Sequence, residues 1–360
     1  MGPGPSNIDP RVLQAMSRPI IGHLDPQFVG LMDEIKKLLR YAFQTENSLT
    51  FPVSAPGSAG MESCFANLVE HGDKVLVCIN GVFGNRMKEN VFRCGGEAVI
   101  VEDDWGSPVS TEKVEEALKD HPDIKIVAFV HAETSTGVCS DAAAISKLAQ
   151  AHECLTILDC VTSLAGTPVL VDKWGIDAAY SGSQKCLSCP PGLSPITFSS
   201  RAIDKIRNRN TPVQSWFLDL SLVMDYWSGD GARSYHHTAP INSMYALHES
   251  LLLLSKEGLE NSWKRHKIRH QELKTGFEKL GLAFMVEEPY RLPQMNSVLI
   301  PESLRLQESE IRKTLLEEYN LEIGSGLGAL AGKIWRVGLM GFGASEENIH
   351  TCISALKQVL

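Results

Sequence analysis

Two short stretches decide the fold, Leu155-Thr156-Ile157-Leu158-Asp159 and Tyr180-Ser181-Gly182-Ser183-Gln184-Lys185. The first is an apolar run that ends in an aspartate, and the second follows the apolar run 176–180 and ends in a lysine. Runs of this length are typical of buried strands in a parallel sheet. Because such sheets bind ligands beyond the carboxyl ends of their strands, the sequence predicts that Asp159 and Lys185 face one site.

The chain around these stretches alternates between strand and helix patterns. Strands are predicted at 74–79, 98–102, 124–131, 155–159, 177–181 and 194–199, and helices at 61–69, 85–94, from Ser110 onward and at 142–152. Short apolar runs that alternate with helices indicate βαβ units, and therefore an α/β fold whose sheet is covered on both faces.

The remainder of the chain predicts a smaller α+β domain. A helical segment runs from about 242 to 280 and is stopped by Gly281. Beyond it, strands are predicted at 283–287, 296–300, 322–324 and 334–340, and helices near 307–319 and 345–359.

An apolar stripe follows one face of the long helical segment. Its members recur at spacings of four and three: Leu259, Trp263, His266, His270, Leu273, Phe277 and Leu280. His266 and His270 are one turn apart, which is a possible metal-ligand spacing. With no carboxylate or cysteine aimed at them, packing is the favoured interpretation.

Composition excludes several classes of function. The 360-residue chain has a formal net charge of −9, which argues against a general nucleic-acid or anionic-membrane binder. The sequence carries no apolar run of membrane-spanning length, no secretory signal pattern and no usual C-terminal peroxisomal tripeptide. The nine cysteines are scattered, which suggests reduced thiols and a cytoplasmic protein. The pair Cys186 and Cys189 could belong to a redox or zinc site, but two packing thiols are favoured because no second pair exists.

Lysine and aspartate at neighbouring strand ends suit pyridoxal 5′-phosphate (PLP). The lysine can form a Schiff base with the cofactor aldehyde, and the carboxylate can keep the pyridine nitrogen protonated. For Lys185 the alternative is a surface loop residue. For Asp159 the alternative is a cap for the following turn.

Further candidates lie where other predicted strands end. Gly57 and Ser58 precede a helical run and could bind the cofactor phosphate at its N-terminus, although an ordinary capped turn looks the same. Phe83 could stack on a flat ring or belong to the core. The hydroxyls of Thr134 and Ser135 could meet the ring oxygen or serve a turn. Arg336 lies in a predicted strand and could bind a carboxylate through two parallel hydrogen bonds, or lie on the solvent face.

Several motifs together resemble the class V aminotransferases, and within them the alanine–glyoxylate and serine–pyruvate group. These are Gly2-Pro3-Gly4-Pro5-Ser6-Asn7, Gly22-His23-Leu24-Asp25-Pro26, Glu133-Thr134-Ser135-Thr136-Gly137, Ser181-Gly182-Ser183-Gln184-Lys185, Tyr235-His236-His237-Thr238 and Trp335-Arg336-Val337-Gly338. The resemblance extends over nearly the whole chain. It implies the fold type I architecture of PLP-dependent transferases, with a mostly parallel seven-stranded sheet.

The resemblance also implies roles for single residues. Lys185 would be the Schiff-base lysine and Asp159 the partner of the ring nitrogen. Val161 and Phe83 would cover the two ring faces, and Ser135 or Thr134 would meet the ring hydroxyl. Arg336 would hold the substrate carboxylate, with the backbone near Pro5 closing over it and Asn242 lining the substrate side chain. The phosphate would be held by Gly57, Ser58 and Gln184, joined by Tyr235 and Thr238 from the second subunit of a homodimer. Pro56 departs from the family pattern at the phosphate turn because it has no N–H.

The domain boundaries predicted on this basis are an N-terminal arm at 1–20, a large PLP-binding domain at 21–255 and a small α+β domain at 256–360. The expected activity is ping-pong transfer of an amino group from alanine or serine to glyoxylate or pyruvate. Ureidoglycine–glyoxylate and 3-hydroxykynurenine aminotransferases share these motifs and stay open as alternatives. A cysteine desulfurase is disfavoured because no cysteine lies between Cys189 and Cys352. A non-catalytic scaffold is disfavoured because the chemical positions are filled.

Overall fold

The computed structural model describes residues 1–227 and 233–360. Its largest sheet contains β1 (Leu49–Val53), β2 (Lys74–Ile79), β3 (Glu97–Glu102), β4 (Ile124–Val130), β7 (Leu155–Asp159), β8 (Ala178–Tyr180) and β9 (Ser194–Phe198). The seven strands lie in the order β1-β9-β8-β7-β4-β2-β3, and β9 alone runs antiparallel to its neighbours. The prediction of a mostly parallel seven-stranded sheet is confirmed.

Strand β1 is absent from the sequence-based prediction. It contains Pro52, which reads as a strand breaker, yet it lies at the edge of the sheet, where a residue without an N–H is tolerated. All of its residues are buried. It places the loop before Gly57 at the same edge of the sheet as Asp159.

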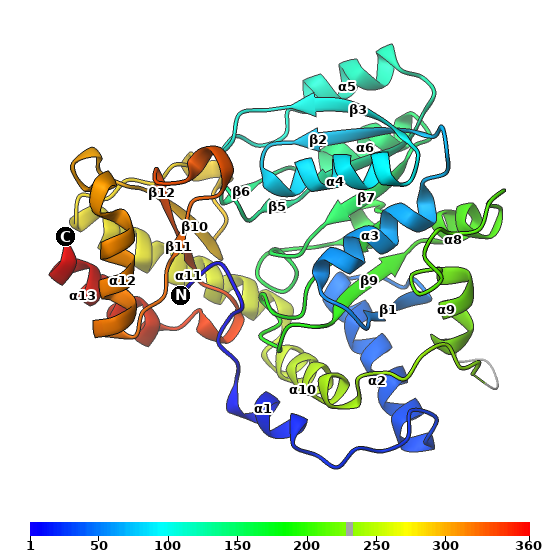
Figure 1. Cartoon of the computed structure of the whole chain (residues 1–360), viewed down its shortest axis with the longest axis horizontal. Helices are drawn as coiled ribbons and strands as arrows, with labels where there is room; N and C mark the ends of the chain where they lie inside the picture. Colours follow the sequence, from blue (N-terminus) through cyan, green and yellow to red (C-terminus); the bar gives the residue numbers. More distant parts are fainter. Residues whose placement is uncertain (228–232) are drawn as a thin grey trace.

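Helices pack on this sheet in contacting pairs (Figure 1). α3 (Gly57–Leu68) contacts α4 (Val82–Arg93), and α5 (Thr111–Asp120) contacts α6 (Ala142–Ala151). Ser110 caps α5 as predicted, because its hydroxyl accepts the Lys113 N–H at 3.2 Å. The remaining helices of this part are α1 (Pro10–Met16), α2 (Pro26–Phe43), α7 (Val171–Trp174), α8 (Ser200–Arg207) and α9 (Leu220–Trp227).

The predicted helical segment 242–280 consists of two helices, α10 (Ile241–Glu257) and α11 (Leu259–Lys279). They separate at Gly258, whose φ of +84° lies in the left-handed region that glycine adopts without strain. The predicted apolar stripe on α11 faces inward, with five of its seven members buried and Trp263 and Leu280 half-buried.

A second sheet has the order β10-β12-β11 and is antiparallel throughout. Its strands are β10 (Met295–Leu299), β12 (Ile334–Gly338) and β11 (Gly324–Ser325), with α11, α12 (Glu308–Tyr319) and α13 (Glu346–Val359) nearby (Figure 1). The predicted strand at 283–287 is wrong. This segment forms one bridge, Phe284 to Val298, before the chain turns into the 3₁₀ helix Glu288–Tyr290, where Pro289 cannot extend a ladder.

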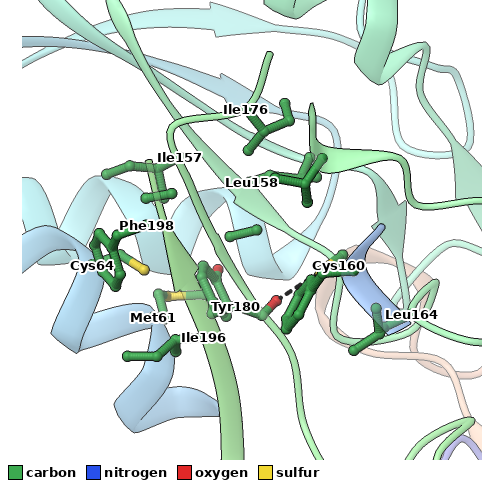
Figure 2. Close-up of a cluster of buried hydrophobic side chains, with 14 of the residues drawn as sticks. Met61, Cys64, Ile157, Leu158, Cys160, Leu164, Ile176, Tyr180, Ile196 and Phe198 are labelled. Carbon is green, nitrogen blue, oxygen red and sulfur yellow. Dashed lines mark hydrogen bonds between the residues drawn. The ribbon is translucent and has the colours of Figure 1, made fainter. Parts of the chain in front are cut away.

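Two separate hydrophobic clusters fill the interior, one around each sheet. Figure 2 shows part of the larger one, in which Met61 and Cys64 of α3 lie near Ile157, Tyr180 and Ile196. This packing holds the ends of β7 and β8 in place. The boundaries at residues 20 and 255 stay predictions. Within residues 1–227 and 233–360, none of the helices has both the length and the apolar character needed to cross a bilayer.

Candidate active site

The carboxyl ends of several strands meet at one edge of the large sheet. Asp159 ends β7 and is paired in register with Tyr180, which ends β8. Glu133 lies three residues after the end of β4, and Phe83 lies in the first turn of α4, which follows β2. Since β2, β4, β7 and β8 are parallel, residues far apart in the sequence converge here.

Asp159 is a buried carboxylate, 3% exposed. One oxygen accepts the Val161 N–H at 2.9 Å, and the other accepts the Tyr180 hydroxyl at 2.8 Å. Burial raises the pKa of Asp159 to about 7, and the charge of Glu133 adds to that effect. The bond from Val161 matches the expected turn cap. Such a carboxylate is a strong acceptor for a cationic ring, because no fixed cation of the protein neutralises it by direct contact among the described residues.

Lys185 lies in the loop between β8 and β9, and its amine is largely shielded from water. Burial lowers the pKa of Lys185 to about 8, and the charge of Arg336 acts in the same direction. The Nζ atom donates a hydrogen bond to the carbonyl of Pro3. An amine with this pKa is partly unprotonated near neutral pH, as a nucleophile and proton carrier must be.

The N-terminal segment lies directly over Lys185. Ser6 donates its N–H to the Gln184 carbonyl at 2.8 Å and its hydroxyl to the Lys185 carbonyl at 2.7 Å. A Cβ on Gly4 would lie 2.7 Å from Lys185 Nζ, and the φ of +101° at this position favours glycine. Pro5 itself is exposed. The backbone of residues 3–6 therefore lies over Lys185, where the predicted closure near Pro5 would place it.

Arg336 comes from the central strand of the small sheet and is 7% exposed, not on a solvent face. Its Nε donates to the Ser325 carbonyl at 2.8 Å, and Nη1 donates to the Thr134 carbonyl at 3.4 Å. The second bond joins the small sheet to the segment that carries Glu133. Nη2 makes no hydrogen bond within the part of the chain that the structure describes, so the guanidinium retains donors for a carboxylate.

Phe83 is half-buried near the first turn of α4. Its N–H donates to Glu133 at 3.1 Å, and the Arg86 guanidinium lies 5.0 Å from its ring centroid. The Ser135 hydroxyl donates to Glu133 at 2.6 Å and accepts the Val82 N–H at 3.0 Å, while the Thr134 hydroxyl pairs with Thr162. Both hydroxyls therefore already have partners within the chain.

Gly57 and Ser58 are the first residues of α3, which begins four residues before the predicted run 61–69. A Cβ on Gly57 would lie 3.5 Å from both the Ser181 carbonyl and Val161, so glycine leaves a small hollow here. Pro56 is the N-cap and provides no side-chain hydrogen bond, while Ser58 is exposed and accepts from Arg86 at 3.3 Å. Gln184 has a buried Oε1 atom with no hydrogen-bond partner in residues 1–227 and 233–360.

Three predicted site residues lie outside this cluster. Tyr235 is 61% exposed, and its hydroxyl lies 3.4 Å from that of Thr238. Asn242 donates to the Met16 carbonyl at 2.6 Å and so holds the N-terminal segment. The side chains of Tyr235 and Thr238 are exposed, so both are accessible for the predicted contact with another subunit. The predicted contact of Asn242 with substrate stays a prediction.

The sequence patterns do not single out four contributors to the site. Tyr180 and Glu133 are fully buried and bond to predicted site residues, Arg86 contacts Ser58 and Phe83, and the Pro3 carbonyl meets Lys185. Only Glu133 had a detectable signal, since a charged residue directly after an apolar strand needs buried partners.

The histidines and cysteines have local packing partners. His266 bonds to the Ser262 carbonyl at 2.7 Å and accepts the Gly341 N–H at 2.9 Å, while His270 bonds to Asn296 at 2.7 Å. Cys186 and Cys189 are buried free thiols whose pKa values burial raises to about 12. No group of three or more potential metal ligands occurs among the residues that the structure describes.

A buried carboxylate at one strand end, beside an amine whose pKa burial lowers, is the arrangement that a PLP site of fold type I requires. The residues present fit that group, because the carboxylate can accept a hydrogen bond from a protonated ring nitrogen and the hollow at Gly57 leaves room at a helix start. The chain belongs to the aminotransferase class V family, whose model matches residues 2–342. This family is PLP-dependent, and the prediction of an aminotransferase is confirmed.

Named relatives cover the whole chain. It is 41% identical to an alanine–glyoxylate aminotransferase of Oryctolagus cuniculus, with 100% of this chain and 92% of the relative aligned. The structure matches an alanine–glyoxylate aminotransferase of Nostoc sp. with a TM-score of 0.97 and 48% identity, covering 100% of this chain and 94% of the other. It also matches a ureidoglycine–glyoxylate aminotransferase of Bacillus subtilis with a TM-score of 0.97 and 39% identity, covering 100% and 92%.

Proposed function

We propose that this enzyme transfers the amino group of a small amino acid, alanine or serine, to glyoxylate or pyruvate in two half-reactions, with PLP bound at Lys185 and Asp159. The observation that carries the proposal is the approach of Lys185 and Asp159 at one sheet edge, with the buried Arg336 supplied by the other sheet. The names of two relatives with full coverage of the chain support alanine and glyoxylate as the substrate pair.

The cofactor, when bound, supplies an aldehyde and an electron-withdrawing ring that weakens the Cα–H bond of the substrate amine. Asp159 would accept a hydrogen bond from the ring N–H and so favour the protonated, positively charged form of that nitrogen. Lys185 would hold the cofactor aldehyde and, once displaced by substrate, would carry the Cα proton on its Nζ atom. Its pKa of about 8 suits both steps near neutral pH.

Arg336 orients the substrate. Its free donors bind the carboxylate, which fixes the Cα–H bond relative to Lys185. The segment 3–6 covers Lys185 and would exclude water from it. Because the Pro3 carbonyl occupies the amine, this segment must yield when cofactor and substrate are bound. Gly57, Ser58 and Gln184 would hold the phosphate, Phe83 and Val161 the ring faces, and Thr134 or Ser135 the ring hydroxyl.

A homodimer is part of this proposal. Exposed aromatic side chains gather beside the Tyr235–Thr238 loop, where Trp216, 63% exposed, stacks on His236 at 4.6 Å between ring centroids, and Tyr235 lies against His23. Exposed aromatics of this kind favour an interface. Light scattering after gel filtration would test it, and a monomer at micromolar concentration with full activity would contradict it.

A half-reaction screen tests the substrate assignment. Purified holoenzyme is mixed with single amino acids, and absorption is followed as the cofactor aldehyde becomes an amine. Alanine or serine should convert it fastest, and glyoxylate should then restore the starting spectrum. The relative from Bacillus subtilis supports ureidoglycine as a second candidate donor, so that compound belongs in the screen. Failure of every small amino acid to change the spectrum would refute the proposal.

Sulfide release from cysteine is the control for a desulfurase. The proposal predicts none, because Cys352 is buried in α13 and burial raises its thiol pKa to about 12.

A further inference from the structure

Glu133 is a buried carboxylate of the site to which the mechanism above gives no role. It is 0% exposed and ends the two-residue strand β5 (Ala132–Glu133). A carboxylate removed from water costs several kcal/mol unless it is fully hydrogen-bonded, so its partners show what its burial achieves.

The hydrogen-bond partners of its carboxylate in the described part of the chain are all donors. One oxygen accepts the Ser135 N–H at 3.1 Å and the Ser135 hydroxyl at 2.6 Å, and the other accepts the Phe83 N–H at 3.1 Å. The Ser135 hydroxyl accepts from Val82 N–H and is therefore free to donate its own proton to Glu133. An ionised carboxylate satisfies this arrangement, whereas an amide would place its NH₂ group against a donor.

The backbone of the neighbouring turn is shaped around this carboxylate. A Cβ on Gly81 would lie 2.4 Å from the Cγ and Cδ atoms of Glu133 and 2.6 Å from the Ser135 hydroxyl. Glycine at position 81 therefore allows the carboxylate to reach the first turn of α4, where free N–H groups and the helix dipole favour a negative charge.

The charge of Glu133 also acts on the groups that face it. It raises the proton affinity of Asp159 and stabilises the cationic form of Arg336. No salt bridge joins Glu133 to Asp159 or Arg336 within residues 1–227 and 233–360, so the interaction acts over distance between buried groups.

We propose that Glu133 is a positioning residue: its carboxylate fixes the start of α4, so that the Phe83 ring is held for stacking, and its charge strengthens Asp159 as the acceptor for the cofactor ring. This inference rests on the proposed function, since it assigns Glu133 to the same PLP site.

The test compares Glu133→Gln with Glu89→Gln, a change of the same type at an exposed site on α4. The dissociation constant of PLP is measured on each apoenzyme by fluorescence, and the holoenzymes are titrated with acid and base while the cofactor absorption is followed. Loss of one charged hydrogen-bond acceptor predicts roughly a 10- to 100-fold weaker PLP affinity in Glu133→Gln. The pH midpoint of the absorption change should also move to lower pH, because a nearby negative charge that favours the protonated cofactor is gone.

A merely structural role would lower the stability of the apoenzyme without moving that midpoint. If Glu133→Gln binds PLP within twofold of wild type with an unchanged midpoint, the inference is refuted. If wild type itself takes up no PLP, the proposed function fails instead. Should Glu133→Gln fail to fold, as judged by circular dichroism, Glu133→Asp keeps the charge but shortens the side chain, so that the carboxylate draws away from the Phe83 N–H. It should weaken PLP about threefold or more, and an unchanged affinity in that variant would overturn the inference.

Discussion

Two regions of this molecule bury titratable groups, and they do so differently. On α11, His266 and His270 each find neutral partners nearby, the Ser262 carbonyl and Gly341 N–H for one and the Asn296 amide for the other. At the sheet edge, the charge of Glu133 acts on the pKa of Asp159 and Arg336, and the charges of Arg336 and Asp159 act on that of Lys185. The amine of Lys185 donates to a carbonyl of the N-terminal segment.

The difference separates packing from chemistry. Burial lowers the pKa of His266 to about 4, and both ring nitrogens are satisfied, so the ring acts as a neutral core residue. The sheet edge holds a carboxylate and an amine whose proton affinities are displaced toward neutrality, and its Gln184 oxygen has no partner in the described part of the chain. Burying these groups without full pairing costs free energy of folding. A ligand that pairs with them would offset part of that cost.

Replacing the lysine at the sheet edge should have the largest effect. Lys185→Ala removes both the attachment point of the cofactor and the proton carrier, so turnover should fall by about 1,000-fold or more. Steady-state transamination of alanine with glyoxylate measures this, and borohydride reduction followed by peptide mapping should find the cofactor on residue 185 in wild type. Lys173→Ala, at an exposed position, is the control. Transamination at wild-type rate in Lys185→Ala would remove the basis of the proposed function.

Replacing Arg336, which lies in the small sheet, should have the second largest effect. Arg336→Lys keeps the charge but loses the planar fork, so KM for both the amino acid and the keto acid should rise by roughly 10- to 100-fold. Turnover at saturation should fall less, since the reacting groups are untouched. Arg305→Lys on the surface of the same domain should leave KM unchanged. An effect on turnover alone would mean that Arg336 does not bind the carboxylate.

Sequence reasoning identifies the convergence of strand ends but not the contacts between them. The positions of Asp159 and Lys185 follow from apolar runs and from the rule for parallel sheets, and the structure places both at the predicted edge. The sequence patterns predict no role for Glu133, because its contacts are with Phe83 and Gly81, which lie about fifty residues earlier in the chain. Periodicity contains no information about such long-range pairs.

The elements that the sequence patterns miss depend on tertiary context. Strand β1 is not predicted because Pro52 is typical of a strand breaker, although an edge strand tolerates it. Gly258 divides the predicted helical segment, although the apolar pattern continues across it. The segment 283–287 has the composition of a strand but makes a single bridge before Pro289 turns the chain away. In each case a tertiary position decided between two local conformations that the residues themselves allow.

The α11 histidines give the opposite expectation to Lys185. His266→Phe leaves the buried Gly341 N–H without an acceptor, so the free energy of unfolding should fall by about 1–3 kcal/mol. KM and turnover of the folded enzyme should stay within twofold of wild type. Urea unfolding and steady-state kinetics measure both, with His350→Phe at an exposed position as control. A tenfold change in KM without loss of stability would mean that His266 contributes to the active site. The two regions would then not differ in the way described above.

The smallest effect concerns the pH dependence of apoenzyme stability. The pKa of Asp159 rises from its usual 3.8 to about 7 on folding, so between these values the native state binds a proton that the unfolded state lacks. The stabilising contribution of Asp159 is therefore complete below pH 4 and is lost as pH rises through 7. Asp159→Asn has no such proton, so the melting temperature of wild type minus that of the variant should decrease from pH 5 to pH 8, by about one or two degrees. Differential scanning calorimetry of both apoproteins measures this. If the difference in melting temperature instead grows with pH, Asp159 is already ionised and paired in the apoenzyme. The charged groups at the sheet edge would then have partners within the chain, as the histidines of α11 do.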